Sequence, residues 1–178
     1  MQRQLLTPFR PFAARRADLS SAQQWLDSGM PAAGPAAPWL PPVAALLARF
    51  ALAGGLIDGD ALVERLRQAR GSERPLPMAQ SIAQVARWIV LGDALAFAGP
   101  GGWLLPLFQF DLSRGAVRAC MQPLLAELRG VFEETELALW FVTPNTWLGE
   151  RRPALEMQGN LAQVLRAARA DRYVARGD

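Results

Sequence analysis

The sequence contains neither histidine nor lysine, and all 19 of its basic residues are arginine. Histidine is the usual general base near neutral pH, a frequent zinc ligand and the common partner of a nucleophilic serine or cysteine. Its absence therefore argues against these kinds of catalytic and metal site. The sequence also has a single cysteine, Cys120, so no disulfide can form within the chain. Its place on the apolar face of an expected helix indicates a buried, unreactive thiol.

The residues that could still carry chemistry have simpler structural explanations. Glu133, Glu134 and Glu136 can be imagined as an acid and a base, but carboxylates in the first turn of a helix are favourable partners of the helix dipole. Residues 99–102 are rich in glycine, yet they lack the spacing and the following Lys-Ser/Thr pair of a phosphate-binding loop. We therefore expect a protein that is not an enzyme and has no catalytic residue, metal site or cofactor.

Long apolar runs are absent as well. The longest candidates are interrupted by Arg49, Arg87 and Asp93, well short of the roughly 20 residues that a membrane span requires. Arginines also interrupt the N-terminus before any apolar run that a signal peptide would need. Together with the lone cysteine, this predicts a soluble, cytoplasmic protein that does not contact a membrane.

Apolar residues make up 51% of the 178 residues, which is enough for a sizeable core in one domain, or in a small domain with an N-terminal appendage. The formal net charge is only +3, but it is unevenly distributed. Arginines gather near both ends of the chain, and an acidic group at residues 127–136 lies between them. This asymmetry suits an anionic partner at one end, and solvated helix faces explain it equally well.

Prolines and glycines divide the chain into three regions: 1–42, 43–112 and 113–178. The first comprises a basic arm, a short helix capped by Asp18 and a Pro/Ala-rich linker. In the second, apolar spacing predicts helices at 43–53, 61–70, 78–91 and 93–97. A short extended segment follows at 103–110, which Pro106 places at a sheet edge. We expect a mainly α protein, a compact multi-helix bundle with this one short extended segment.

The third region is predicted to be helical throughout. Apolar residues at helical spacing indicate a helix over 115–129, in which Pro123 either causes a kink or opens a second helix. Residues 137–142 are apolar on every side and predict a helix that is buried all round. Thr143 is expected to cap a short turn that begins at Pro144 and closes at Gly149.

The chain then continues to a last helix. Pro153 is expected to open a short helix that Gly159 closes. Asn160 and Gln163 have the spacing of a capping box for the helix that follows, whose apolar residues share one face: Leu161, Val164, Leu165 and Ala168. The residues before it fold around two tryptophans, so we interpret Trp140 and Trp147 as buried core anchors and Asn145 as a helix-start residue that bonds backbone groups.

This order of residues resembles the toxin-binding domain at the C-terminus of the MbcA/ParS/Xre family of antitoxins. The positions that carry the resemblance, together with the helix from Asn160, are Trp140, Pro144, Asn145, Trp147, Leu148, Gly149 and Pro153. The segment WLLPLFQFD at 103–111 is similar to the aromatic-Gln-Phe segment of longer members. The resemblance covers roughly residues 103–178.

The resemblance implies a function and a set of contact residues. In the family, the C-terminal domain covers the active site of the partner toxin, and several partners are RES-domain toxins that consume or transfer parts of NAD. The candidate toxin-binding residues are polar or less buried positions of the last helix: Arg166, Arg169, Arg172, Tyr173, Val174 and Arg176. Arginine and tyrosine are enriched in interface centres, and arginines suit a pocket built for an anionic dinucleotide.

The resemblance also bears on DNA binding. Longer members carry a helix-turn-helix with a wing-like segment before the aromatic-Gln-Phe motif. The corresponding second helix here is 93–97, which offers no arginine, asparagine or glutamine to read bases. We therefore expect a degenerate helix-turn-helix that does not read DNA directly.

Our leading hypothesis is a non-catalytic antitoxin-like protein that binds a cognate toxin and occludes its active site, while residues 18–110 support a homodimer or assembly. Two alternatives remain open. One is a transcriptional regulator that binds DNA through the basic arm and the degenerate helix-turn-helix. The other is a scaffold module that acts without a toxin.

Overall fold

The computed structural model describes residues 43–69, 77–99 and 102–177, so the predicted arm, short helix and linker at 1–42 lie outside the described residues. The elements of the first half are α2 (Val43–Ala51), β1 (Leu56–Asp58), α3 (Gly59–Ala69), α4 (Met78–Leu91), β2 (Phe97–Gly99) and β3 (Gly102–Pro106). Those of the second half are the 3₁₀ helix η1 (Leu107–Gln109), β4 (Phe110–Asp111), β5 (Ala116–Val117), α5 (Met121–Leu128), α6 (Glu134–Val142), the 3₁₀ helix η2 (Thr146–Leu148), α7 (Pro153–Glu156) and α8 (Leu161–Arg176). The prediction of a mainly α protein is confirmed at this level.

Two small antiparallel sheets replace the single extended segment that the sequence predicts. In the larger one the strand order is β1-β3-β2, with Ile57 opposite Leu105 and Phe97 opposite Leu104. The prediction that Pro106 places its strand at an edge is wrong, because β3 is the central strand. Pro106 is the last residue of β3, where the missing N–H interrupts no further pairing.

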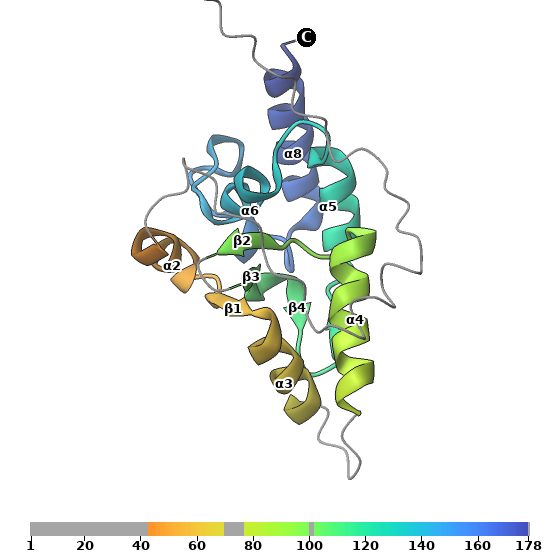
Figure 1. Ribbon diagram of the computed structural model, residues 1–178. Helices are drawn as coiled ribbons and strands as arrows, with labels where there is room; N and C mark the ends of the chain where they lie inside the picture. The colour runs from red at the N-terminus through yellow and green to blue at the C-terminus, as the bar shows by residue number, and fades with distance from the viewer. Residues whose placement is uncertain (1–42, 70–76, 100–101, 178) are drawn as a thin grey trace, which may run out of the picture.

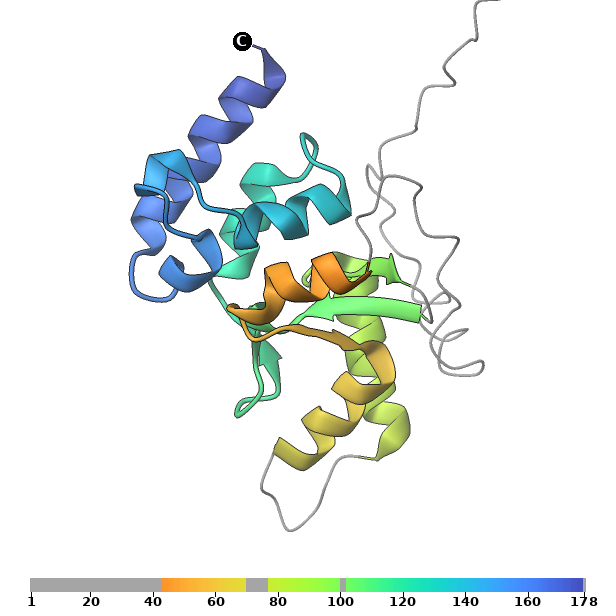
Figure 2. The same ribbon diagram turned by 90° about the vertical axis from the view of Figure 1, so that its left-hand side faces the viewer.

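The sheet separates two groups of helices (Figures 1 and 2). The α3–α4 pair lies at one end of the molecule, and the helices α5 to α8 gather at the other. From α2 to β3 the elements follow the order helix, strand, helix, helix, strand, strand, so the α3–α4 pair is followed by the β2–β3 hairpin. In that order α4 occupies the place of the second helix.

The segment after α4 is not a helix, which corrects the prediction for residues 93–97. Gly92 ends α4 with a φ of 75°, in the left-handed region that favours glycine. The next buried residues lead directly into β2, where Phe97 pairs with Leu104. A short run that is apolar on every side fits a buried strand as well as a buried helix, so the pattern alone could not distinguish them.

The helix expected over 115–129 is also shorter than predicted. Ala116 and Val117 form β5 against β4, and α5 begins only at Met121. Pro123 therefore lies in the first turn of α5, where the N–H that proline lacks has no partner within the helix. It neither causes a kink nor opens a second helix.

Buried apolar residues form two clusters. One lies between the α3–α4 pair and the sheet and includes Leu62, Val85 and Leu105. The other lies among α5, α6 and α8 and includes Leu124, Phe141 and Val164, together with Phe50 from α2. Within the described ranges, no helix is long and apolar enough to cross a membrane.

Candidate partner-binding site

The carboxylate of Asp171, on α8, accepts hydrogen bonds from three side chains of the segment that carries the family resemblance. Its Oδ2 accepts from Trp140 Nε1 at 2.7 Å and from Asn145 Nδ2 at 2.6 Å, and its Oδ1 accepts from Trp147 Nε1 at 2.9 Å. We call these four residues the Asp171 cluster. They join the end of α6, the turn around η2 and the terminal helix into one unit.

Asn145 gives the turn its shape. Its side-chain oxygen accepts from the backbone N–H of Trp147 at 3.0 Å, so Asn145 caps η2 while its amide nitrogen reaches Asp171. Thr143 ends α6 instead of capping the next turn, because its hydroxyl donates back to the carbonyl of Leu139. Gly149 closes η2 at a φ of 63°, as predicted.

Trp147 does not anchor the core, which corrects the prediction. Its side chain is 55% exposed, whereas the neighbouring Leu148 is 1% exposed and joins the core of the C-terminal helices. Trp140 is half-buried and packs edge-to-face on Phe141, with ring centroids 5.1 Å apart. The two tryptophans therefore share a hydrogen-bond acceptor but differ in burial, and Trp147 presents an oriented aromatic ring to solvent.

A shallow groove of about 330 Å³ lies along α6 next to the Asp171 cluster. Its lining residues are Phe132, Glu136, Leu139, Trp140, Thr143, Pro144 and Asn145. We call it the α6 groove. Trp140 and Asn145 belong to both the groove and the cluster, so the two features form one continuous surface.

The last helix has the predicted apolar face but not the predicted caps. Val164, Ala167 and Ala168 are buried, and Leu161 and Leu165 pack beside them. Asn160 is the N-cap residue, but it makes no side-chain cap; its amide donates to the side chain of Gln163 instead.

The residue expected to close the helix before it does not act as a left-handed cap either. The helix α7 ends at Glu156, and Met157 is its C-cap in a right-handed conformation. The φ angle of Gly159 is not in the left-handed region. Pro153 does open α7, as predicted, and is buried.

The six predicted toxin-binding residues of α8 fall into two groups. Arg169 and Arg172 turn towards α5, where both bind the carboxylate of Glu127, Arg169 at an Nε–Oε1 distance of 2.7 Å. The hydrogen bond from Arg169 and the charge of Arg172 hold the pKa of Glu127 below its ordinary value. These two arginines therefore support the packing of α8.

The other four residues, Arg166, Tyr173, Val174 and Arg176, are exposed. Tyr173 and Val174 are 61% and 67% exposed and lie where α8 projects past the neighbouring helices (Figures 1 and 2). An exposed tyrosine and valine between arginines make this end of α8 the more available contact surface.

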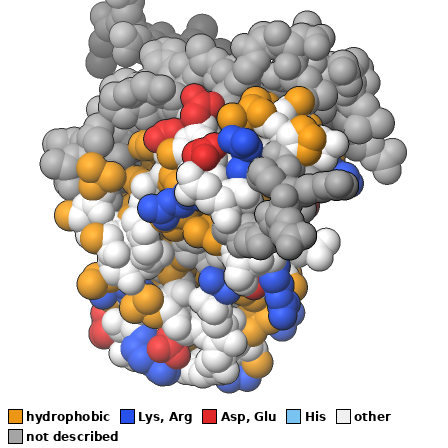
Figure 3. All heavy atoms as spheres, turned by 90° about the horizontal axis from the view of Figure 1, so that it is seen from below, with side chains coloured by type: hydrophobic (Ala, Val, Ile, Leu, Met, Phe, Trp, Pro, Cys, Tyr) orange, Lys and Arg blue, Asp and Glu red, His pale blue; other side chains and the backbone are white. Residues whose placement is uncertain are grey.

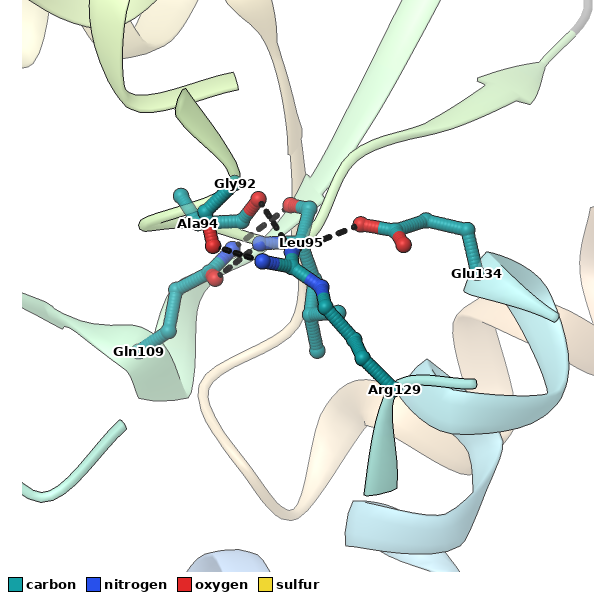
Figure 4. A network of polar contacts seen from close by, with 6 residues as sticks. All are labelled: Gly92, Ala94, Leu95, Gln109, Arg129 and Glu134. Atoms are coloured by element: carbon teal, nitrogen blue, oxygen red, sulfur yellow. Dashed lines mark hydrogen bonds and ion pairs between the residues drawn. The ribbon is translucent and has the colours of Figure 1, made fainter. Parts of the chain in front are cut away.

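A second polar network fixes the loop after α4 (Figure 4). Gln109, which is fully buried, accepts from the N–H of Leu95 at 2.7 Å and donates to its carbonyl at 2.9 Å. Arg129 donates to the carbonyls of Gly92 and Ala94. These contacts tie the loop between α4 and β2 to η1 and to the end of α5.

Arg129 also pairs with Glu134, at the start of α6, at 3.3 Å. Burial raises the pKa of the Glu134 carboxyl above its ordinary value, and the charge of Arg129 opposes that rise only in part. We call Gln109, Arg129 and Glu134 the loop clamp. The aromatic-Gln-Phe pattern draws attention to Gln109 in the sequence, but no pattern indicates its partners.

A larger hollow of about 480 Å³ lies on the outer face of α4. It is lined by Gln80, Ala83, Gln84, Arg87, Trp88 and Asp93. Gln84 donates to the carbonyl of Gly115 at 2.8 Å, so part of this face is already engaged by the β4–β5 turn. Figure 3, which views the molecule from the α3–α4 end, shows arginines scattered among neutral, apolar and acidic side chains.

Asp171 and Glu127 are the residues of this site that the sequence did not indicate. Asp171 is the only acidic residue of α8, and an acid in an otherwise basic helix was the available signal.

Among the described residues, no three histidine, cysteine, aspartate or glutamate side chains gather where they could hold a metal ion. Comparison with protein-family models, curated proteins and solved structures finds no match for this chain.

Proposed function

We propose that this protein is a non-catalytic, antitoxin-like protein that binds a cognate toxin, of the RES type by resemblance, and occludes its active site. The Asp171 cluster is the observation that supports the proposal. Three of the residues that carry the family resemblance, Trp140, Asn145 and Trp147, converge on the terminal helix. The motif and the helix that would reach the toxin thus form one physical unit.

The toxin contact is made by the projecting end of α8. Tyr173 and Val174 supply exposed apolar area there, and Arg176 supplies a cation at the same end. Arg166, in the first half of α8, supplies a second cation, and neither arginine is engaged by Glu127. Guanidinium groups bind carboxylates and phosphates with two parallel hydrogen bonds, which suits a toxin pocket built for an anionic dinucleotide.

Co-expression with the protein encoded beside this gene tests the proposal. We expect the native chain to co-purify with that protein and to relieve its toxicity, and the double variant Tyr173→Ala/Val174→Ser to lose both effects. Leu155→Ser is the matched control, because Leu155 is 53% exposed but lies on α7. Capture that is unchanged in the double variant, or lost equally in the control, would contradict a contact through the end of α8.

A second candidate function is binding to duplex DNA through α4, and the side chains on the outer face of that helix are the observation that supports it. Gln80, Ala83 and Arg87 lie at helical spacing on the outer face of α4, with the small Ala83 between the two long polar side chains. Amide and guanidinium groups are the side chains that read adenine and guanine in the major groove. The sequence argued against base reading because segment 93–97 carries no side chain that reads bases. That argument does not apply to α4.

Anisotropy titrations with duplex DNA from the upstream region of the gene test this candidate. Arg87→Ala and Gln80→Ala should each cost about 1–3 kcal/mol of discrimination between sequences. Arg49→Ala, an exposed arginine on α2, should leave discrimination unchanged. Weak binding that is lost equally for all sequences as salt rises would leave only non-specific attraction and would count against this candidate.

A further inference from the structure

The α6 groove has a definite chemical character. Its walls are the half-buried Phe132, Leu139 and Trp140, with the exposed Pro144 at one end. Exposed apolar surface of this kind, in a hollow between polar residues, typically marks a site where another chain segment binds. Aromatic rings beside a proline are the lining found in grooves that bind polyproline segments.

The charge at the groove is negative. Glu136 lines it, and Glu136 Oε2 accepts from the backbone N–H of Glu133 at 3.0 Å, which holds the Glu136 carboxylate at the start of α6. Among the residues that the structure describes, none that lines the groove is basic. The site is therefore suited to an occupant that combines apolar rings with a cation.

The chain contains a segment with this composition outside the described residues. Residues 8–16 read PFRPFAARR, with two prolines three positions apart, two phenylalanines and three arginines, and no acid occurs before Asp18. A Pro-x-x-Pro spacing favours the extended polyproline conformation, which binds aromatic grooves at a low entropic cost. The other proline-rich stretch, 31–42, carries no charge. Residues 8–16 therefore complement the Glu136 carboxylate better than residues 31–42 do.

The connection between the segment and the folded part is long enough for binding within one molecule. Residues 17–42 separate the segment from α2, and an extended chain spans at most about 3.3–3.6 Å per residue. Fully extended, these residues would span about 85–95 Å, and α2 itself lies against α6, the helix that carries the groove.

We propose that residues 8–16 bind in the α6 groove of the same chain, with the phenylalanine rings against Trp140 and Pro144 and an arginine beside Glu136. This contact does not depend on the proposed function. It covers Trp140, Pro144 and Asn145, which carry the family resemblance, so any partner that uses this surface competes with the arm. The arm is thereby an internal inhibitor of the surface.

Paramagnetic broadening in the full chain tests the proposal. A nitroxide is attached to Thr7→Cys in a Cys120→Ala background, and the tryptophan indole signals are observed by ¹⁵N NMR. We expect the strongest loss of intensity at Trp140 and the weakest at Trp88, which lies on α4. Equal loss at all indoles, or loss at Trp88 greater than at Trp140, would overturn the proposal.

Variants separate specific binding from chance proximity. Phe9→Ser/Phe12→Ser and Glu136→Gln should both restore the Trp140 signal, and glutamine keeps the capping contact to Glu133. Glu150→Gln is the matched control, an exposed carboxylate outside the groove, and should leave the broadening intact. A mixed sample, with the nitroxide only on molecules without ¹⁵N, should show no loss at Trp140; loss there would assign the arm to a second copy and overturn binding within one chain.

Discussion

Asp171 holds together parts of the chain that lie 24 to 31 residues apart, through hydrogen bonds to two indoles and one amide. The donors are neutral, so the carboxylate has no counter-ion within the cluster. Hydrogen bonds in which the acceptor is ionised are shorter and stronger than neutral ones. One charged acceptor is thus enough to orient both Trp140 and the solvent-exposed Trp147.

Asp171→Asn should loosen this cluster. The amide is neutral and presents only one oxygen, so at least one of the three donors loses its acceptor. We expect the free energy of unfolding to fall by about 1–3 kcal/mol. We also expect the Trp147 side chain to become more mobile and its fluorescence to be quenched more easily. Urea denaturation and acrylamide quenching measure the two effects. Glu150→Gln, an exposed carboxylate outside the cluster, should change neither quantity.

Gln109 plays a similar part in the interior. Gln109→Leu keeps the volume but leaves the N–H and the carbonyl of Leu95 buried without a partner. Each unsatisfied buried group costs about 1–3 kcal/mol, so we expect a loss of at least about 2 kcal/mol in the free energy of unfolding. Gln122→Leu, at an exposed position of α5, is the control and should lie near the native value. A Gln109 variant as stable as the native chain would show that another group satisfies Leu95.

Local sequence patterns predicted the backbone of the turn around η2 better than they predicted which side chains the turn contacts. Proline at 153 and glycine at 149 stand where the structure has a helix start and a helix end, because these preferences depend on the local backbone. Which of two adjacent apolar residues, Trp147 or Leu148, enters the core depends on how the turn meets α8. That contact is not encoded within the turn itself.

At the scale of the helices, two glutamates with opposite pKa shifts make the free energy of unfolding depend on pH in opposite directions. The pKa of Glu127, which binds Arg169 and Arg172, is lowered, and the pKa of the half-buried Glu134 is raised. A lowered pKa contributes stability above the unfolded pKa, and this is lost as pH falls. A raised pKa contributes stability below the unfolded pKa, and this is lost as pH rises through the folded value.

The free energy of unfolding, measured by urea denaturation from neutral to acidic pH, checks these signs. The advantage of the native chain over Glu127→Gln should be greatest at neutral pH and shrink as pH falls through the glutamate range. The advantage over Glu134→Gln should grow as pH falls through the raised pKa of Glu134. Parallel curves for both variants would contradict the opposite shifts. The contact of Glu127 with Arg169 and Arg172 is partly exposed, so its contribution to the free energy of unfolding stays below about 1 kcal/mol.

Helix existence followed from apolar spacing, whereas helix boundaries often did not. Residues 78–91 form α4 as predicted, with the periodic face that includes Val85 buried. Residues 93–97 and 116–117 lie in or lead into strands, because hairpin partners outside these short segments, such as Leu104 for Phe97, were available. Short segments have too few residues for their own periodicity to outweigh such pairing.

At the scale of the whole molecule, the loop clamp joins the α3–α4 end to the helices α5 to α8. Arg129→Ala removes the donors to the carbonyls of Gly92 and Ala94 and leaves Glu134 without its cation. We expect a loss of about 1–3 kcal/mol in the free energy of unfolding and faster amide hydrogen exchange at the end of α4. Arg114→Ala, at an arginine that is 84% exposed, should leave both unchanged. Slow exchange at α4 in the Arg129 variant would show that the apolar contacts alone join the two ends.

Composition and local pattern were sufficient to predict a mainly helical protein, the last amphipathic helix and the turn residues of the motif, because these features depend on residues close together in the chain. The tertiary structure alone decided which side chains meet. It paired Arg169 and Arg172 with Glu127, exposed Trp147, brought Asp171 to the motif and made α4 the second helix of the pair. These outcomes depend on the rotation and packing of elements that are distant in sequence, and no local pattern carries that information.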